Sequence, residues 1–235
     1  MATMAVGAVV VGCGSSGSGG SGGSATEPSA VRADQSSSPT AATAEKLAAD
    51  SGVRYGGIGV PEAIEGLVCD EGDGGFRFGS DLDIRVSSDD GLKELEGGED
   101  VADEVSCFGS PRIILRKGTM AASAPVFTAR TNLYEQVADP AASLNTIFER
   151  TVRLEEGYGR NFTGEPRTFT SPTLVVTCQQ NVTDTFPMTT CFWANYGAAG
   201  VLDFFPPDGQ RVPIESAVRL TKDFVVGALK AKTGS

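Results

Sequence analysis

The side chains that could do chemistry in this chain are carboxylates, because the sequence contains no histidine. Without histidine, Ser-His-Asp and Cys-His catalysis are excluded, and the commonest metal ligand is missing. A pair of carboxylates could still act as general acid and general base. The candidate pairs are Asp81/Asp83 and Glu155/Glu156, but both patterns are also typical of a solvated surface. The sequence therefore predicts no catalytic residue and leans against an enzyme.

The acidic residues are concentrated in one stretch of the chain. The net charge is −11, and the stretch from Asp70 to Glu104 holds 13 acidic and 3 basic residues. Calcium prefers oxygen ligands, but Asp70, Asp73, Asp81 and Asp83 do not have the EF-hand spacing. A solvated acidic face is favoured, and we expect neither a metal nor another cofactor. Nucleic acid is not an expected partner, because phosphate binding needs clustered Lys and Arg.

Five cysteines are present, and the first, Cys13, directly follows the apolar stretch 4–12. That stretch has the length of the apolar region of an export signal. Val10-Val11-Gly12-Cys13 resembles the lipobox of bacterial lipoproteins. The resemblance implies a signal peptide at 1–12 that is cleaved before Cys13. It also implies diacylglycerol on the Cys13 sulfur and acylation of the new amino group.

The residues after Cys13 favour this interpretation over a buried first strand. Residues 13–43 are rich in Gly and Ser, then in Ser, Thr, Ala and Pro. Such a segment buries too little apolar surface to offset its ordering entropy, so we expect a disordered tether. The sequence thus predicts a domain at 44–235, held by lipid at the extracytoplasmic face of the cell membrane. No Lys or Arg precedes the apolar stretch, so we expect translation to start upstream of Met1.

The other four cysteines are expected to form disulfides, since export would place them in an oxidising compartment. Three pairings are possible. Cys69–Cys107 with Cys178–Cys191 is favoured, because each pair lies within one region of the chain and the second could staple a hairpin. A metal site or redox pair is disfavoured, because there is no CxxC motif and no histidine.

Alternating polarity predicts strands in the first half of the domain. Phe76, Phe78, Leu82, Ile84 and Val86 occupy even positions between polar neighbours, which is typical of half-buried strands. A further strand is predicted at 113–115. Helices are predicted at 41–50, 62–67, 133–137 and 142–152, the last beginning at Asp139-Pro140, and a loop is predicted at 157–172.

The C-terminal third has the clearest pattern. Strong β-formers at 173–178, 189–195 and 200–205 predict three strands, arranged most simply as an antiparallel meander. A helix should then run from Pro213 to about Lys230, because its apolar residues recur at i, i+3, i+4 and i+7. We therefore expect a single α+β domain, with an antiparallel sheet carrying helices on one face.

One motif in this third resembles a known group of proteins. Val176-x-Cys178, then Cys191-Phe192-Trp193-Ala194-Asn195-Tyr196-Gly197, resembles a motif of uncharacterised actinobacterial, Streptomyces-like secreted and lipid-anchored proteins. The resemblance covers roughly residues 173–230 and implies no established activity. Asn195 stands where the pattern usually has Asp. Trp193, Asn195 and Tyr196 form the possible ligand or packing motif, and core packing is favoured over ligand stacking for Trp193.

Three functions are compatible with these observations. The favoured one is a non-enzymatic binding or interaction module with an unknown protein or small-molecule partner. A carboxylate-dependent extracellular hydrolase and a regulatory partner of a neighbouring membrane protein are the alternatives. A deep cleft with two facing carboxylates, one of them desolvated, would favour the enzyme. A closed domain with a shallow exposed apolar patch would favour the binding module.

Overall fold

The computed structural model describes residues 45–62, 64–72, 82 and 84–232. All of them belong to one compact unit, Thr43–Ser235. The expected signal peptide at 1–12, Cys13 and the expected tether at 13–43 lie outside the described residues. Phe76 and Phe78, from the predicted alternating strands, lie outside them as well.

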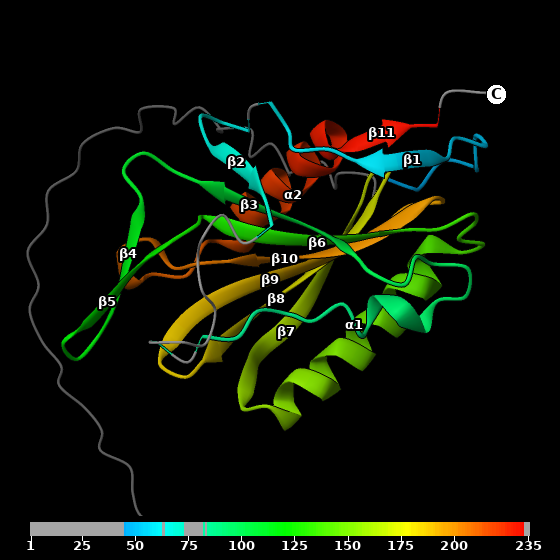
Figure 1. Cartoon of the computed structure of the whole chain (residues 1–235). Helices are drawn as coiled ribbons and strands as arrows, with labels where there is room; N and C mark the ends of the chain where they lie inside the picture. The colour runs from blue at the N-terminus through cyan, green and yellow to red at the C-terminus, as the bar shows by residue number, and fades with distance from the viewer. Residues whose placement is uncertain (1–44, 63, 73–81, 83, 233–235) are drawn as a thin grey trace, which may run out of the picture. The chain divides into compact units, whose positions relative to one another are not determined.

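A seven-stranded antiparallel sheet forms the centre of the unit, in the order β2-β3-β6-β10-β9-β8-β7 (Figure 1). Consecutive strands β7 to β10 are neighbours, so the three predicted C-terminal strands belong to a longer meander. The strands of the sheet are β2 (Val68–Glu71), β3 (Asp103–Phe108), β6 (Phe127–Leu133), β7 (Arg160–Thr170), β8 (Val175–Thr183), β9 (Phe186–Ala194) and β10 (Ala198–Phe204).

Strand β7 corrects the predicted loop at 157–172. Its Gly and Pro content suggested a loop, yet the strand pairs with β8 along most of its length. The pairing register shifts between Thr163 and Arg167, around Gly164 and Pro166. An edge strand can accommodate such a bulge and a proline, because one of its sides needs no ladder hydrogen bonds.

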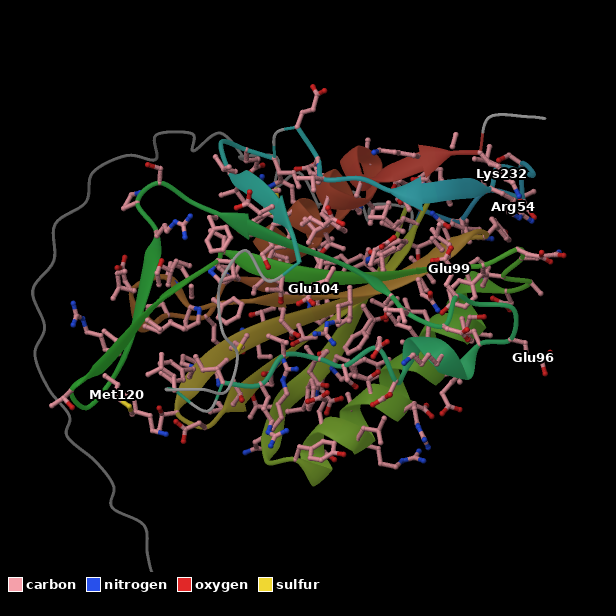
Figure 2. The ribbon with its side chains drawn as sticks, in the orientation of Figure 1. Arg54, Glu96, Glu99, Glu104, Met120 and Lys232 are labelled. Atoms are coloured by element: carbon pink, nitrogen blue, oxygen red, sulfur yellow. A yellow bond between two sulfur atoms is a disulfide. The ribbon has the colours of Figure 1, made fainter. Side chains whose placement is uncertain are left out.

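Two smaller β-elements flank the main sheet. Strand β1 (Tyr55–Ile58) pairs with β11 (Leu229–Ala231), which follows the last helix. Strands β4 (Ile113–Lys117) and β5 (Met120–Ala124) form a hairpin that confirms the predicted strand at 113–115. Met120 lies exposed at the tip of this hairpin (Figure 2). Two short 3-10 helices, η1 (Leu92–Glu94) and η2 (Pro207–Gly209), complete the described elements.

Helix α1 (Pro140–Gly157) begins where the sequence predicted. The Asp139 carboxylate accepts hydrogen bonds from the backbone N–H groups of Ala141 and Ala142, and Pro140 occupies the first turn. Helix α2 (Ile214–Ala228) follows Pro213, and its predicted apolar stripe is buried. Neither described helix is long and apolar enough to cross a membrane.

The two helices cover opposite faces of the sheet, which corrects the expectation of helices on one face. Phe224 of α2 shares an apolar cluster with Val176 and Trp193. Leu144 of α1 shares a different cluster with Val175 and Phe192. Successive strand residues point to opposite faces, and nearly every residue of β8, β9 and β10 is buried. Because apolar side chains of these strands point to both faces, both faces are covered by a helix.

Three short predicted helices are wrong within the described residues. Residues 45–50 and 64–67 contain no helix, and Leu133 ends strand β6 opposite Ala198. Isolated helices of fewer than about 12 residues are marginal, so long-range pairing decides such segments. The predicted strand around Leu82 and Ile84 is also not a ladder strand. These two side chains are nonetheless buried, in a third cluster beneath the β4–β5 hairpin.

Both disulfides join residues that face each other across neighbouring strands. Cys69 of β2 pairs with Cys107 of β3, with 4.0 Å between the Cα atoms. Cys178 of β8 pairs with Cys191 of β9, with 4.1 Å between the Cα atoms. These are the pairs that the sequence favoured, and each staples a strand pair of the main sheet.

Candidate functional site

A cavity of about 680 Å³ lies at the C-terminal end of α1. Three parts of the chain meet there: the segment 84–90, the end of α1 and the turn between β8 and β9. Its wall mixes apolar and polar side chains, as ligand sites do. The described residues of its wall include Arg85, Ser88, Asp90, Glu155, Tyr158 and Asp184.

Glu155 is the buried carboxylate of this cavity, with an exposed fraction of 3%. One of its oxygens, Oε1, accepts a hydrogen bond of 3.1 Å from the backbone N–H of Ser88. Burial raises the pKa of Glu155. The Ser88 hydrogen bond and the charge of Arg160 oppose this, while Asp203 adds to it. Glu155 therefore holds a proton more readily than an exposed glutamate does.

A buried ion pair between Arg160 of β7 and Asp203 of β10 holds this wall of the cavity in place. The Arg160 guanidinium also donates to Asn181 Oδ1 at 2.9 Å, to Ser87 Oγ at 2.8 Å and to Thr190 Oγ1 at 2.6 Å. The Ser87 backbone N–H donates to Asp203 Oδ2 at 2.5 Å. Burial alone would raise the pKa of Asp203, but Arg160 and these hydrogen bonds outweigh it and lower the pKa.

Strand register places this polar network on the α1 face of the sheet. Arg160 begins β7 opposite Thr183, and Thr190 of β9 lies opposite Asp203 of β10. The network fixes Ser87 against the sheet, and its neighbour Ser88 then reaches Glu155. The ion pair thus positions the wall of the cavity.

The other charged side chains of the cavity are exposed to solvent, and each contacts another side chain of the protein. Arg85 lies over the Tyr158 ring, 5.1 Å from its centroid, and Asp184 forms a 2.7 Å ion pair with Lys117. Asp90 accepts a hydrogen bond from the Ser88 hydroxyl at 3.2 Å. The cavity can therefore offer a ligand the buried Glu155 carboxylate, with the Tyr158 ring and exposed acidic residues nearby.

The structure separates the carboxylates that the sequence grouped as pairs. Glu155 is buried at the cavity wall, whereas Glu156 is exposed. Asp81 and Asp83 lie outside the described residues. Asp70 is exposed on β2, and no group of three metal-ligating side chains occurs in the described part of the chain.

Trp193 packs in the core on the α2 face and is fully buried. Its indole lies against Gly200 of the neighbouring strand, where an added Cβ would come within 2.7 Å of the indole nitrogen. A glycine is therefore needed opposite this tryptophan. This position leaves no face of the indole for a ligand, because the side chain has no solvent exposure.

Asn195 and Tyr196 hold the β9–β10 turn in place. Asn195 Oδ1 accepts from the backbone N–H groups of Gly197 and Ala198, both at 2.9 Å. Its Nδ2 donates to the Tyr55 hydroxyl at 3.1 Å. Tyr196 donates from its hydroxyl to the carbonyl oxygen of Ala48 at 3.0 Å. An aspartate at 195 could accept the same two backbone bonds but would lack the amide donor.

A further cavity, about 390 Å³, is lined by Arg54, Glu99 and Lys232 near the β1–β11 pair (Figure 2). The Arg54 guanidinium is already used, because it forms a bidentate ion pair with Asp50 and donates to the Glu135 carbonyl. The charge of Arg54 is consequently matched within the protein.

Sequence reasoning missed Arg160 and Asp203. Arg160 fell in a predicted loop, where an arginine needs no explanation. Asp203 carried a usable signal, because it interrupts the apolar strand Val201-Leu202-Asp203-Phe204. A charge in the middle of such a strand requires a buried partner.

Replacing Asp203 with asparagine should lower the free energy of unfolding by about 3–5 kcal/mol, since it leaves the buried Arg160 charge uncompensated. Urea unfolding followed by circular dichroism measures the change. Asp223→Asn is the matched control, because Asp223 is exposed on α2. Equal stability of the two variants would contradict a structural role for the ion pair.

Comparison with protein-family models, with curated proteins and with solved structures finds no match to this chain. The actinobacterial resemblance of residues 173–230 accordingly stays an expectation.

Proposed function

We propose that this protein is an extracytoplasmic binding module, anchored by lipid on Cys13, that holds a small cationic ligand in the Glu155 cavity. One observation carries the ligand site: the Glu155 carboxylate is buried at the wall of a 680 Å³ cavity. The Arg160–Asp203 pair below it is matched within the protein. Glu155 is thus the buried charge that a ligand can reach.

The charge of the rim favours a cation over an anion. Among the described lining residues, Asp90 and Glu155 carry no ion pair, Asp184 is paired with Lys117, and Arg85 is the cation. A ligand ammonium beside Glu155 would gain a charge-assisted hydrogen bond and would favour the ionised carboxylate. An anion would instead meet the acidic rim.

Two features support the extracytoplasmic location. The lipobox-like sequence at Cys13 is followed by a Gly/Ser-rich segment suited to a spacer. Both disulfides of the domain also fit an oxidising compartment, because cytosolic thiols are kept reduced.

A carboxylate-dependent hydrolase is the second candidate, favoured by the raised pKa of Glu155 in a cavity. A general acid needs such a pKa, but it also needs a second carboxylate that faces the substrate. Asp203 is committed to Arg160, and Asp90 is exposed. The geometry therefore favours binding over hydrolysis. Regulation of a neighbouring membrane protein would use the same anchor and stays a prediction.

Glu155→Gln should abolish ligand binding while Glu156→Gln, one residue along the same helix, should not. The parent chain carrying Cys13→Ser is screened against small mono- and diamines by thermal shift and calorimetry. An amine that stabilises the parent and Glu156→Gln, but binds Glu155→Gln at least tenfold more weakly, supports the proposal. If no amine binds, or if Glu155→Gln binds equally well, the proposed site is wrong. Hydrolysis of glycoside or ester substrates that Glu155→Gln eliminates would establish the hydrolase instead.

The stability of the unliganded protein should depend on pH through Glu155. Because its pKa is raised from an ordinary value of 4.5, folding favours the protonated form. That stabilisation is complete below the unfolded pKa and is lost as the pH rises through the folded pKa. Glu155→Gln stays neutral, so its stability relative to the parent should increase between pH 4 and pH 7. Urea unfolding at several pH values measures this difference, and a pH-independent difference would contradict it.

The anchor predicts that Cys13→Ser moves the protein from the membrane fraction to the soluble fraction. Ser18→Ala, a matched change in the same segment, should leave it in the membrane. Intact mass spectrometry of the membrane-bound parent should show loss of residues 1–12, added acyl mass and two disulfides. A Cys13→Ser protein that sediments with membranes as firmly as the parent would refute the anchor.

A further inference from the structure

A second ligand-sized cavity, about 420 Å³, lies on the other side of the sheet. It is formed where α2, strand β1 and the start of β8 come together. Leu174, Val225 and Tyr55 line it and belong to, or pack against, the apolar cluster on the α2 face. Glu155 lies on the α1 side, so the two cavities use different walls.

The wall of this cavity is mainly apolar. Leu174 and Val225 are buried, and Leu229 is half-buried against the same cluster. Val226, at the edge of the cavity, is 81% exposed and is the most exposed large apolar side chain of the described residues. An apolar ligand portion that covers Val226 and Leu229 would remove this surface from water.

Polar groups of Tyr55, Asn195, Lys222, Ser171 and Thr173 interrupt the apolar wall. The Tyr55 hydroxyl accepts from the Asn195 amide, which leaves its own proton free to be donated. Burial raises the pKa of Tyr55, so that proton is kept at neutral pH. Lys222 is the charged residue among the described residues of the wall, and no described carboxylate forms an ion pair with it.

The charge of this wall is opposite to that of the whole chain. The net charge is −11, yet the cavity presents a lysine and no described carboxylate. An apolar wall with one unmatched cation complements a molecule that has an alkyl tail and a single negative head. A cationic amphiphile would be repelled, and a polar anion without a tail would leave the wall uncovered.

We propose that this cavity binds a monocarboxylate amphiphile with an alkyl tail. Its alkyl tail covers Val226 and Leu229 beside the buried Leu174 and Val225, and its carboxylate pairs with Lys222. This site is independent of the proposed amine site, because it lies on the α2 face and selects the opposite charge. It also gives a ligand-facing role to Asn195, which orients the Tyr55 hydroxyl at the wall.

Head-group selectivity tests the role of Lys222. The full chain carrying Cys13→Ser is titrated by calorimetry with decanoate, decan-1-ol and decylammonium, each below its micelle-forming concentration. Decanoate should bind best and decylammonium worst. Lys222→Ala should lower the affinity for decanoate about threefold to fivefold, the effect of losing a partly exposed ion pair. It should leave the affinity for decan-1-ol unchanged. Lys222→Glu should reverse the order of the two charged ligands.

Matched controls separate this site from general charge effects. Lys93→Ala and Lys93→Glu make the same charge changes on η1, outside the cavity. They should leave all three affinities unchanged. Equal losses from the Lys93 and Lys222 variants, or equal affinities for decanoate and decylammonium in the parent, would overturn the proposal.

Chain length tests the apolar wall. Affinity should rise from hexanoate to octanoate to decanoate, by about fourfold for each methylene that becomes buried. Val226→Asp lies at an exposed position, where folding should tolerate the change. It should reduce the rise of affinity with chain length. Circular dichroism checks that the variant is folded. Affinity that does not depend on chain length in the parent would show that the tail does not occupy the cavity.

Discussion

The Arg160–Asp203 ion pair is the interaction on which the α1 side of this protein depends. It lies where β7, β9 and β10 contribute polar residues to one face of the sheet, and both partners are buried. An unpaired charge in that place would be strongly destabilising, and the side chains of Ser87, Asn181 and Thr190 add hydrogen bonds to the pair. Through Ser87 and Ser88 the same pair sets the position of the segment that closes over Glu155. Stability and the shape of the cavity are consequently coupled at this point.

The sheet separates two environments of different chemistry. On the α1 face, an acidic cavity contains a carboxylate whose pKa is raised by burial. On the α2 face, an apolar cavity carries a lysine. The strands between them are buried on both sides, which is why a single sheet can present two ligand-sized sites without sharing a wall.

Local patterns in the sequence predicted the elements whose signals are local. The Asp139 cap, the apolar stripe of α2 and the strands β8 to β10 were recognisable, because each depends on residues close in the chain. The edge strand β7 was missed because Gly164 and Pro166 suggest a loop unless the neighbouring strand is known. The opposite placement of the helices could have been inferred from the continuous apolar runs of β9 and β10. Only part of the candidate site could be predicted. The sequence singled out Glu155, but its hydrogen-bond partner Ser88 lies 67 residues earlier in the chain. Arg160 begins β7, which was predicted to be a loop.

The bridge between Cys69 and Cys107 spans 38 positions of the chain and closes them into a covalent ring. The ring contains the acidic stretch, including the segment that covers Glu155. A protease that cut the backbone anywhere inside it would leave both fragments joined through sulfur, with β2 still paired to β3. Cleavage within this ring would therefore not by itself detach the N-terminal part from the domain, and reduction would be required before the pieces could separate.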